Sequence, residues 1–177
     1  MTAGIPDSMT FSQMTPEAAL TRHNSELARA GAAAMHRHYQ ETIDICSDLL
    51  TAGVYDDIAE VDAEAARAAR AETRLIMATA MHYNESHYED IVRVLNAALD
   101  SPPAVQKDVY FTLAVLHASF DREEPARAAM EKCVALLASL RGSADAEEKS
   151  ALDEKEKEAR QFLKELGRPH PAEESYD

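Results

Sequence analysis

The chain has 177 residues, of which 46% are hydrophobic, and its formal net charge at pH 7 is −14. This length is enough for one domain with a hydrophobic core, whereas the acidity argues against binding to nucleic acid or to anionic membranes, both of which attract clustered Lys and Arg. No apolar stretch reaches the roughly 20 residues that span a bilayer. Only five residues are glycine and Ala, Leu, Glu and Arg are abundant, so we expect an all-α fold without a β-sheet. The two cysteines, Cys46 and Cys133, lack metal-ligand spacing and are expected to be buried free thiols.

The N-terminal segment leads into the first predicted helix. Residues 1–14 mix Thr, Ser, Met, Gly and Pro without a period, which is typical of a flexible arm. They lack the basic flank and apolar core of a secretory signal, so we expect a cytoplasmic protein. Thr15, Pro16 and Glu17 then start a helix, because a hydroxyl caps the first turn, proline fits its first position and a carboxylate faces the positive end of the helix dipole. This helix should end near Arg37.

Further helices follow, and turn-forming residues mark their ends. Gly53 is placed to end one of them with a left-handed cap. Residues 55–83 contain no helix breaker, so they form either one long helix or a short helix joined to a longer one. Pro102 and Pro103 stop a later helix, because proline disfavours helix at the residue before it. The other expected helices cover residues 39–50, 88–100, 108–118 and 123–140.

The C-terminal part of the chain is rich in charge. After a hinge at Gly142 and Ser143, residues 144–167 form a predicted Lys/Glu-rich helix with one narrow apolar stripe. Such a helix either caps a helical array, shielding its last unit from water, or forms a coiled-coil arm for a partner. Residues 168–177 are an acidic tail. The apolar stripe consists of Leu152, Ala159, Phe162, Leu163 and Leu166.

A helix-turn-helix unit occurs twice in succession. Residues 75–103 match residues 110–137, with Ile91 and Ala126 in equivalent places 35 residues apart. A looser copy precedes them, and relative to a period of about 34 residues some 15 extra residues are inserted near residues 51–68. The matching residues are Leu27, Ala30, Gly31, Ala34, Tyr39, Thr42, Cys46 and Leu49 in the first copy, Leu75, Ala78, Ser86, Tyr88, Ile91, Leu95, Ala98 and Pro103 in the second, and Tyr110, Leu113, Ala114, His117, Asp121, Ala126, Met130 and Cys133 in the third.

These residues and this period resemble the tetratricopeptide repeat (TPR) family, over residues 24–140. The resemblance implies a short right-handed TPR-like helical solenoid of about three repeats, within a domain at residues 15–141, that holds other proteins. The chain departs from the family at Thr79, His82 and Ser86, where glycine or alanine, an aromatic residue and glycine are usual. The alternative is another α-helical array or an irregular bundle, because Ala-rich amphipathic helices produce small-residue matches by chance.

In such a solenoid the first helix of each repeat lines a concave groove. The resemblance places eight mainly apolar residues on this groove. An apolar groove is normally occupied, either by a partner helix or extended peptide, or by the chain's own N-terminal arm or C-terminal helix. The predicted partner-binding residues are Met35, Ile76, Ala80, Tyr83, Phe111, Val115, Ala118 and Ser119.

Some members of the family bind the acidic C-termini of chaperones through a clamp of Lys, Asn and Arg side chains. The matching positions here carry other residue types, so the chain should not hold an acidic chaperone tail. These positions are Ala28, Ala32, Met77, Asp108 and Thr112.

Other candidate sites are weak. His36 and His38 have no further metal ligands at suitable helical spacing and are expected to lie in an exposed turn. His82 and His117 share one repeat position, where a half-buried imidazole in place of an aromatic ring is a simpler explanation than a pH switch. The chain contains no phosphate-cradling loop or nucleophile motif, so we expect no enzyme activity, cofactor or metal.

The leading functional prediction is an adaptor or assembly subunit that grips a helical or extended segment of a larger complex in the apolar groove. A second hypothesis is a small acidic chaperone that shields a hydrophobic client segment, because the size, acidity and three repeats resemble the TPR chaperones of bacterial type III secretion. A third is a structural subunit associated with filaments or microtubules.

Overall fold

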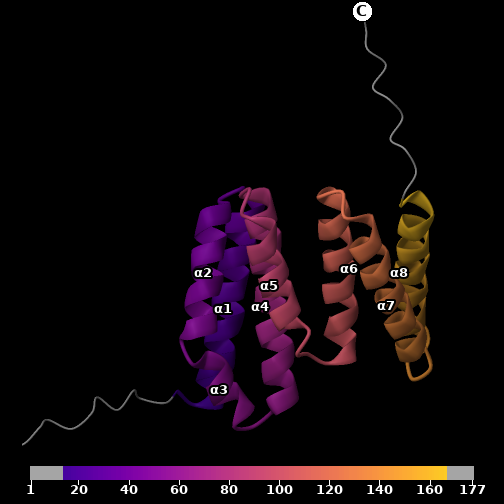
Figure 1. The fold of residues 1–177 in the computed structure, drawn as a ribbon. Coiled ribbons are helices and arrows are strands. Elements are labelled where there is room, and N and C mark those ends of the chain that lie inside the picture. Colours follow the sequence, from indigo (N-terminus) through magenta and orange to yellow (C-terminus); the bar gives the residue numbers. More distant parts are fainter. Residues whose placement is uncertain (1–13, 167–177) are drawn as a thin grey trace, which may run out of the picture.

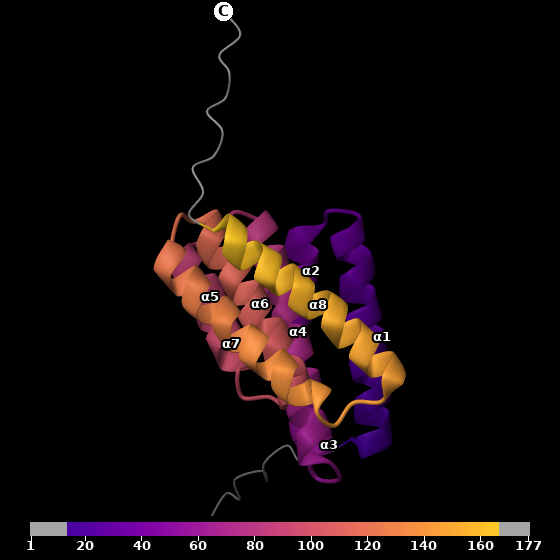
Figure 2. The ribbon, with the colours of Figure 1, turned by 90° about the vertical axis from the view of Figure 1, so that its right-hand side faces the viewer.

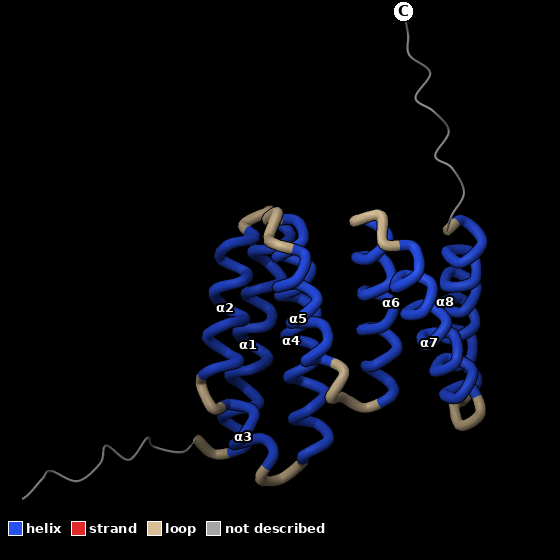
Figure 3. Tube along the Cα trace, in the orientation of Figure 1, coloured by secondary structure: helices blue, strands red, loops and turns tan. Residues whose placement is uncertain are grey.

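The computed structural model describes residues 14–166, and this part of the chain forms eight α-helices and no strand (Figure 3). The predicted all-α class is therefore confirmed for the described residues. Most of the predicted arm (residues 1–13) and the acidic tail lie outside them. The helices are α1 (Pro16–Met35), α2 (Tyr39–Thr51), α3 (Val54–Ala59), α4 (Ala63–Tyr83), α5 (Tyr88–Ala98), α6 (Pro103–Ser119), α7 (Glu123–Arg141) and α8 (Ala146–Glu165).

Side chains cap the N-termini of three helices. One of these caps is predicted from the sequence, and the other two are aspartates. The Thr15 hydroxyl accepts a hydrogen bond of 3.3 Å from the Ala18 N–H at the start of α1, as predicted. Asp62 caps α4, and Asp145 caps α8 in a reciprocal capping box with Glu148. These caps satisfy N–H groups that have no partner within the helix.

The region between α2 and α4 contains the predicted insertion. Gly53 has φ +73° and follows α2, so the predicted left-handed turn is confirmed. Residues 55–83 are divided into the short helix α3 and the long helix α4. Tyr55 anchors α3, because its hydroxyl forms hydrogen bonds with Thr73 Oγ1 of α4 (2.6 Å) and His23 Nδ1 of α1 (3.4 Å).

The start of α6 differs from the prediction. The helix begins at Pro103 rather than at residue 108. Pro102 is in the extended conformation at the N-cap position, and Pro103 occupies the first turn, where its missing N–H costs no hydrogen bond. The two prolines therefore end one helix and also start the next.

The pairs α1/α2, α4/α5 and α6/α7 are hairpins with the same turn (Figure 1). After the first helix of each pair, one residue other than glycine has positive φ: Arg37 (62°), Glu85 (56°) and Asp121 (56°). The N–H of the next residue bonds to a carbonyl five residues back, which is the hydrogen bond of a Schellman cap. These bonds join His38 to Ala33 (2.9 Å), Ser86 to Met81 (3.0 Å) and Arg122 to His117 (2.8 Å).

The helix pairs lie side by side in chain order, and α8 lies against α7 at the C-terminal edge (Figures 1 and 2). The largest core cluster runs through α4 to α8 and ends at Ala159 of α8, which is fully buried. A second cluster surrounds Tyr55 and Leu49 between α1 and α4. The helix α6 packs extensively on α7 and much less on α4 and α5, so the joint between α4/α5 and α6 has the lighter packing.

Candidate functional site

A cleft of about 760 Å³ opens between α1, α2, α4 and α6. This volume is within the range of protein ligand sites, about 300–1,000 Å³. The cleft is lined by Gly31, Ala34, Arg37, Tyr39, Leu75, Ile76, Thr79, Ala80, Tyr83 and Thr112.

The lining of the cleft offers few free polar groups. The hydroxyls of Thr79 and Thr112 donate hydrogen bonds to the carbonyls of Leu75 (2.9 Å) and Asp108 (2.8 Å) in their own helices. Gly31 leaves open space, because a Cβ added there would meet no atom within 4 Å. The cleft can therefore accept apolar groups without leaving many polar atoms unpaired.

Two tyrosines and an arginine form the rim of the cleft. The rings of Tyr39 and Tyr83 stack with centroids 5.3 Å apart and an interplanar angle of 20°, and Tyr83 is 61% exposed. Asn84 donates a hydrogen bond of 3.1 Å to Gln40, which ties the end of α4 to α2. Arg37 lines the cleft, and within residues 14–166 no carboxylate lies at ion-pair distance from its guanidinium. The rim thus combines aromatic surface with a cation.

The structure brings three of the eight predicted groove residues together in the cleft: Ile76, Ala80 and Tyr83. Met35 (80% exposed) and Val115 (42% exposed) lie outside the lining, on α1 and α6. The other three predicted residues are also on α6 and outside the lining: Phe111, Ala118 and Ser119.

Phe111 packs under α8 rather than facing the cleft. It is half-buried and packs against the large core, and the Lys155 ammonium of α8 lies 5.7 Å from the centre of its ring. This placement depends on α8, which the repeat pattern does not include.

Sequence reasoning missed the other cleft residues as site residues. Gly31 and Ala34 were identified as repeat positions, which was a usable signal. No local signal pairs Tyr39 with Tyr83, because they are 44 positions apart in the chain. Thr112, a position compared with the chaperone clamp, does line the cleft.

Asp108, another clamp position, is held in an ion-pair cluster. It contacts the ammonium groups of Lys107 (2.7 Å) and Lys155, so it links α6 to α8. Burial would raise the pKa of Asp108, but the hydrogen bonds and charges of the two lysines outweigh burial and hold this pKa below its usual value. The Asp108 carboxylate therefore holds α8 against α6.

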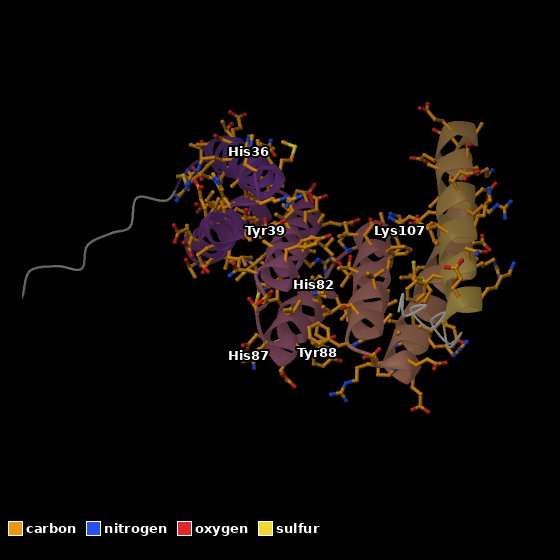
Figure 4. All side chains as sticks on the ribbon, turned by 90° about the horizontal axis from the view of Figure 1, so that it is seen from above. His36, Tyr39, His82, His87, Tyr88 and Lys107 are labelled. Atoms are coloured by element: carbon orange, nitrogen blue, oxygen red, sulfur yellow. The ribbon has the colours of Figure 1, made fainter. Side chains whose placement is uncertain are left out.

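An aromatic cluster joins α4 and α5 to α6 and positions the α6 side of the cleft. Tyr88 Oη and His117 Nδ1 form a hydrogen bond of 2.7 Å, and the Tyr88 ring lies 5.1 Å from that of Phe120. The Arg122 guanidinium lies 5.6 Å from the Tyr88 ring centre. His82 packs on Phe120 at 5.9 Å. Figure 4 shows His82 and Tyr88 at this joint, away from His36 at the α1–α2 turn.

Both histidines of this cluster are half-buried, as predicted. Burial lowers the pKa of His117, and the positive charge of Arg122 lowers it further. The neutral His117 imidazole therefore forms its hydrogen bond with Tyr88 inside an apolar contact.

Several other predicted features can be checked against the structure. Cys46 and Cys133 are buried free thiols, as predicted, and burial raises the pKa of each to about 11. His36 and His38 are exposed. Within residues 14–166, no group of three or more His, Cys, Asp or Glu side chains could hold a metal ion. No helix in this range is both long and apolar enough to cross a membrane.

The chain matches no protein-family model, and comparisons with curated proteins and with solved structures also gave no match.

Proposed function

We propose that this chain is a short TPR-like solenoid that acts in the cytoplasm as a non-enzymatic adaptor or assembly subunit. Its cleft between α1, α2, α4 and α6 holds an apolar helical or extended segment of a partner protein. The observation that carries this proposal is the cleft itself, with its apolar lining and its exposed tyrosine rim.

The recurring hairpin turn supports the repeat architecture. The first helices of the three hairpins are α1, α4 and α6, and the same three helices contribute residues to the cleft. In a TPR stack the first helices line the binding surface. The three turns at Arg37, Glu85 and Asp121 are equivalent in backbone geometry, although their residue types differ.

The distribution of exposed apolar side chains supports binding on the first helices. Among the described residues, six large hydrophobic side chains are exposed, and five of them lie on the first helices or at their C-terminal ends. Of these five, Tyr83 lines the cleft. The five residues are Leu20, Met35, Tyr83, Val115 and Phe120.

Affinity capture from the native cells, with quantitative mass spectrometry, tests the proposal when two cleft variants are compared with the wild type. Tyr83→Ala removes an exposed aromatic group, and such anchors often contribute about 2 kcal/mol to binding. Gly31→Leu fills the open space without introducing a poor helix former. Both variants should lose the same partner while keeping wild-type helicity by circular dichroism.

Val61→Ala is the matched control, because Val61 is an exposed apolar residue outside the cleft, between α3 and α4. It should retain the partner. Equal recovery of every captured protein by the wild type and both cleft variants would rule out the cleft as the binding site.

A further inference from the structure

We propose that the partner segment is an acidic amphipathic helix, which lies along α6 between the cleft and a second pocket beside α8. The inference rests on the proposed function and deepens it, because it assigns the partner segment a conformation and a charge. Three features support it: an exposed apolar face of α6, a shortage of hydrogen-bonding groups in the cleft, and cations on both sides of this face.

The helix α6 is apolar on its outer face as well as on its buried side. Residues 109–119 contain no Asp, Glu, Lys or Arg. At about 100° per residue, Ala104, Phe111 and Val115 fall within about 40° of one another around the helix axis and form the outer face of α6. Val115 is 42% exposed, and Ala104 is also exposed. A helix that is apolar all round is normally covered all round, so we expect a further segment on this face.

The outer face of α6 lies between two pockets. Thr112, on one side of this face, lines the cleft. Lys107, on the other side, lines a second pocket of about 370 Å³ between α6, α7 and α8, which Lys155 of α8 also lines. Figure 4 shows Tyr39 and Lys107 on the side of α4 and α6 opposite to Tyr88. A segment that lies along α6 can therefore contact both pockets.

The N-terminal half of α8 forms one wall beside this face. The helix α8 packs on α7, and its N-terminal half projects past α6 on the side of α1 (Figure 2). The opposite wall consists of α1 and α2, which line the cleft. At a rise of about 1.5 Å per residue, residues 104–118 of α6 are about 21 Å long, so a partner helix of about 15 residues matches this length.

The polar groups of the cleft favour a helix over an extended segment. An extended segment has backbone N–H and C=O groups that need hydrogen-bond partners when they are buried. The hydroxyls of Thr79 and Thr112 donate their hydrogen bonds to carbonyls of their own helices, so the cleft has few donors left for such a backbone. A helix satisfies its own backbone groups and presents apolar side chains at i, i+3, i+4 and i+7. It is therefore the conformation that this surface accepts at the lower cost of desolvation.

The charges beside the outer face of α6 favour an acidic helix. Asp108 contacts both lysines of the second pocket, and each ammonium has three N–H donors, of which Asp108 accepts one. Three positive charges therefore face two negative ones, in a chain that has 32 acidic and 18 basic residues. Carboxylates on the flanks of a partner helix can pair with the cations on either side. The two pockets are lined by three cations and one carboxylate, namely Arg37, Lys107, Lys155 and Glu148.

Display selection against the full-length chain tests the conformation and the charge of the segment. The library holds fragments of about 16 residues from all proteins of the native cells, a length that matches α6. It contains helical and extended, acidic and basic segments alike. We expect the enriched fragments to be acidic, to carry apolar residues at helical spacing, and to gain α-helical circular dichroism when they bind as synthetic peptides.

Two variants of the outer face and one of the rim locate the binding. Val115→Glu should weaken binding of the enriched peptides about tenfold or more, because it buries an unpaired carboxylate. Ala104→Glu should also weaken it, although a carboxylate in the first turn favours α6 itself. Arg37→Glu should weaken binding about fivefold. This last effect should vanish for peptides whose carboxylates are replaced by amides.

Val61→Glu and Arg67→Glu are the matched controls, because both residues are exposed and line neither pocket. They should bind the peptides as the wild type does. Enriched fragments that are basic, that bind in an extended conformation, or that bind Val115→Glu equally well would overturn the inference. Enrichment of this chain's own helices alone would overturn it in favour of contact between two copies.

The same selection separates this inference from the proposed function. If the enriched fragments are extended or basic but are lost on Tyr83→Ala, only the inference fails. If acidic helices bind along α6 whether or not Tyr83 is present, the inference holds and the cleft loses its proposed role. If the wild type enriches no fragment over Tyr83→Ala and Val115→Glu, both fail.

Discussion

The three hairpin turns place single residues in a strained backbone conformation. Arg37, Glu85 and Asp121 have positive φ, where the Cβ of an L-residue crowds the backbone at a cost of about 1–2 kcal/mol. The capping hydrogen bonds of each turn compensate for this cost. Sequence reasoning put the usual turn glycine at Ser86, but the left-handed residue is Glu85. The hydrogen-bond register of the hairpin, rather than the residue type, decides which residue adopts positive φ.

Glycine should relieve this strain. Asp121→Gly is expected to raise the free energy of unfolding by about 1 kcal/mol, because glycine adopts positive φ without a Cβ clash. Urea denaturation followed by circular dichroism measures the change. Glu131→Gly, at an exposed position inside α7, should instead lower it by about 1 kcal/mol. A loss of stability in Asp121→Gly would show that the aspartate side chain stabilises the turn by more than the strain costs.

Among the helices, α8 combines a highly charged sequence with a small apolar contact. Leu152, Phe162 and Leu163 pack against the large core around the buried Ala159. Arg141 of α7 pairs with Asp153 of α8 at 3.0 Å. These contacts favour the capping interpretation of this helix, because its predicted apolar stripe faces the chain's own core. The predicted ends at 144 and 167 were each within two residues of the observed helix.

A charge at the centre of this contact should detach α8. Ala159→Glu places an unpaired carboxylate at a fully buried position. The free energy needed to bury this charge should exceed the free energy that the apolar contacts of α8 contribute. We expect faster hydrogen exchange throughout α8 and faster thiol labelling of Cys133, which belongs to the same core cluster. Ser150→Glu, at an exposed position on the side of α8 opposite Ala159, is the control and should behave as the wild type. Unchanged exchange in Ala159→Glu would contradict the capping role.

At the scale of the whole molecule, two histidines connect different parts of the fold. His23 links α1 to Tyr55 of α3, and His117 links α6 to Tyr88 of α5. Burial is the main reason that the pKa of His23 is lowered, although the charge of Glu72 opposes it. The pKa of His117 is lowered by burial and by Arg122. Both imidazoles are therefore more easily protonated in the unfolded chain.

This difference predicts a loss of stability in mild acid. An unfolded histidine has a pKa of about 6.5, so the folded state keeps its full advantage above this pH and loses it as the pH falls towards the lowered folded values. The free energy of unfolding, measured in urea from pH 7.5 to 5.5, should decrease. His117→Phe should show a smaller decrease than the wild type, because one of the two proton-linked groups is gone. An equal or larger decrease in this variant would exclude His117 as a contributor.

The sequence by itself determined the all-α class, the start of α1, the left-handed turn at Gly53 and the buried thiols. These features depend on residues close together in the chain. The start of α1 depends on a hydroxyl residue next to a proline, the turn depends on a glycine that follows an amphipathic helix, and the burial of each thiol depends on a cysteine at an apolar helical position. Only the tertiary structure decided which residues line the cleft. Tyr39 stacks on Tyr83, although the two are 44 positions apart in the sequence, and Phe111 packs beneath α8 rather than in the cleft. Such contacts depend on how whole helices pack, and local propensity carries no information about that packing.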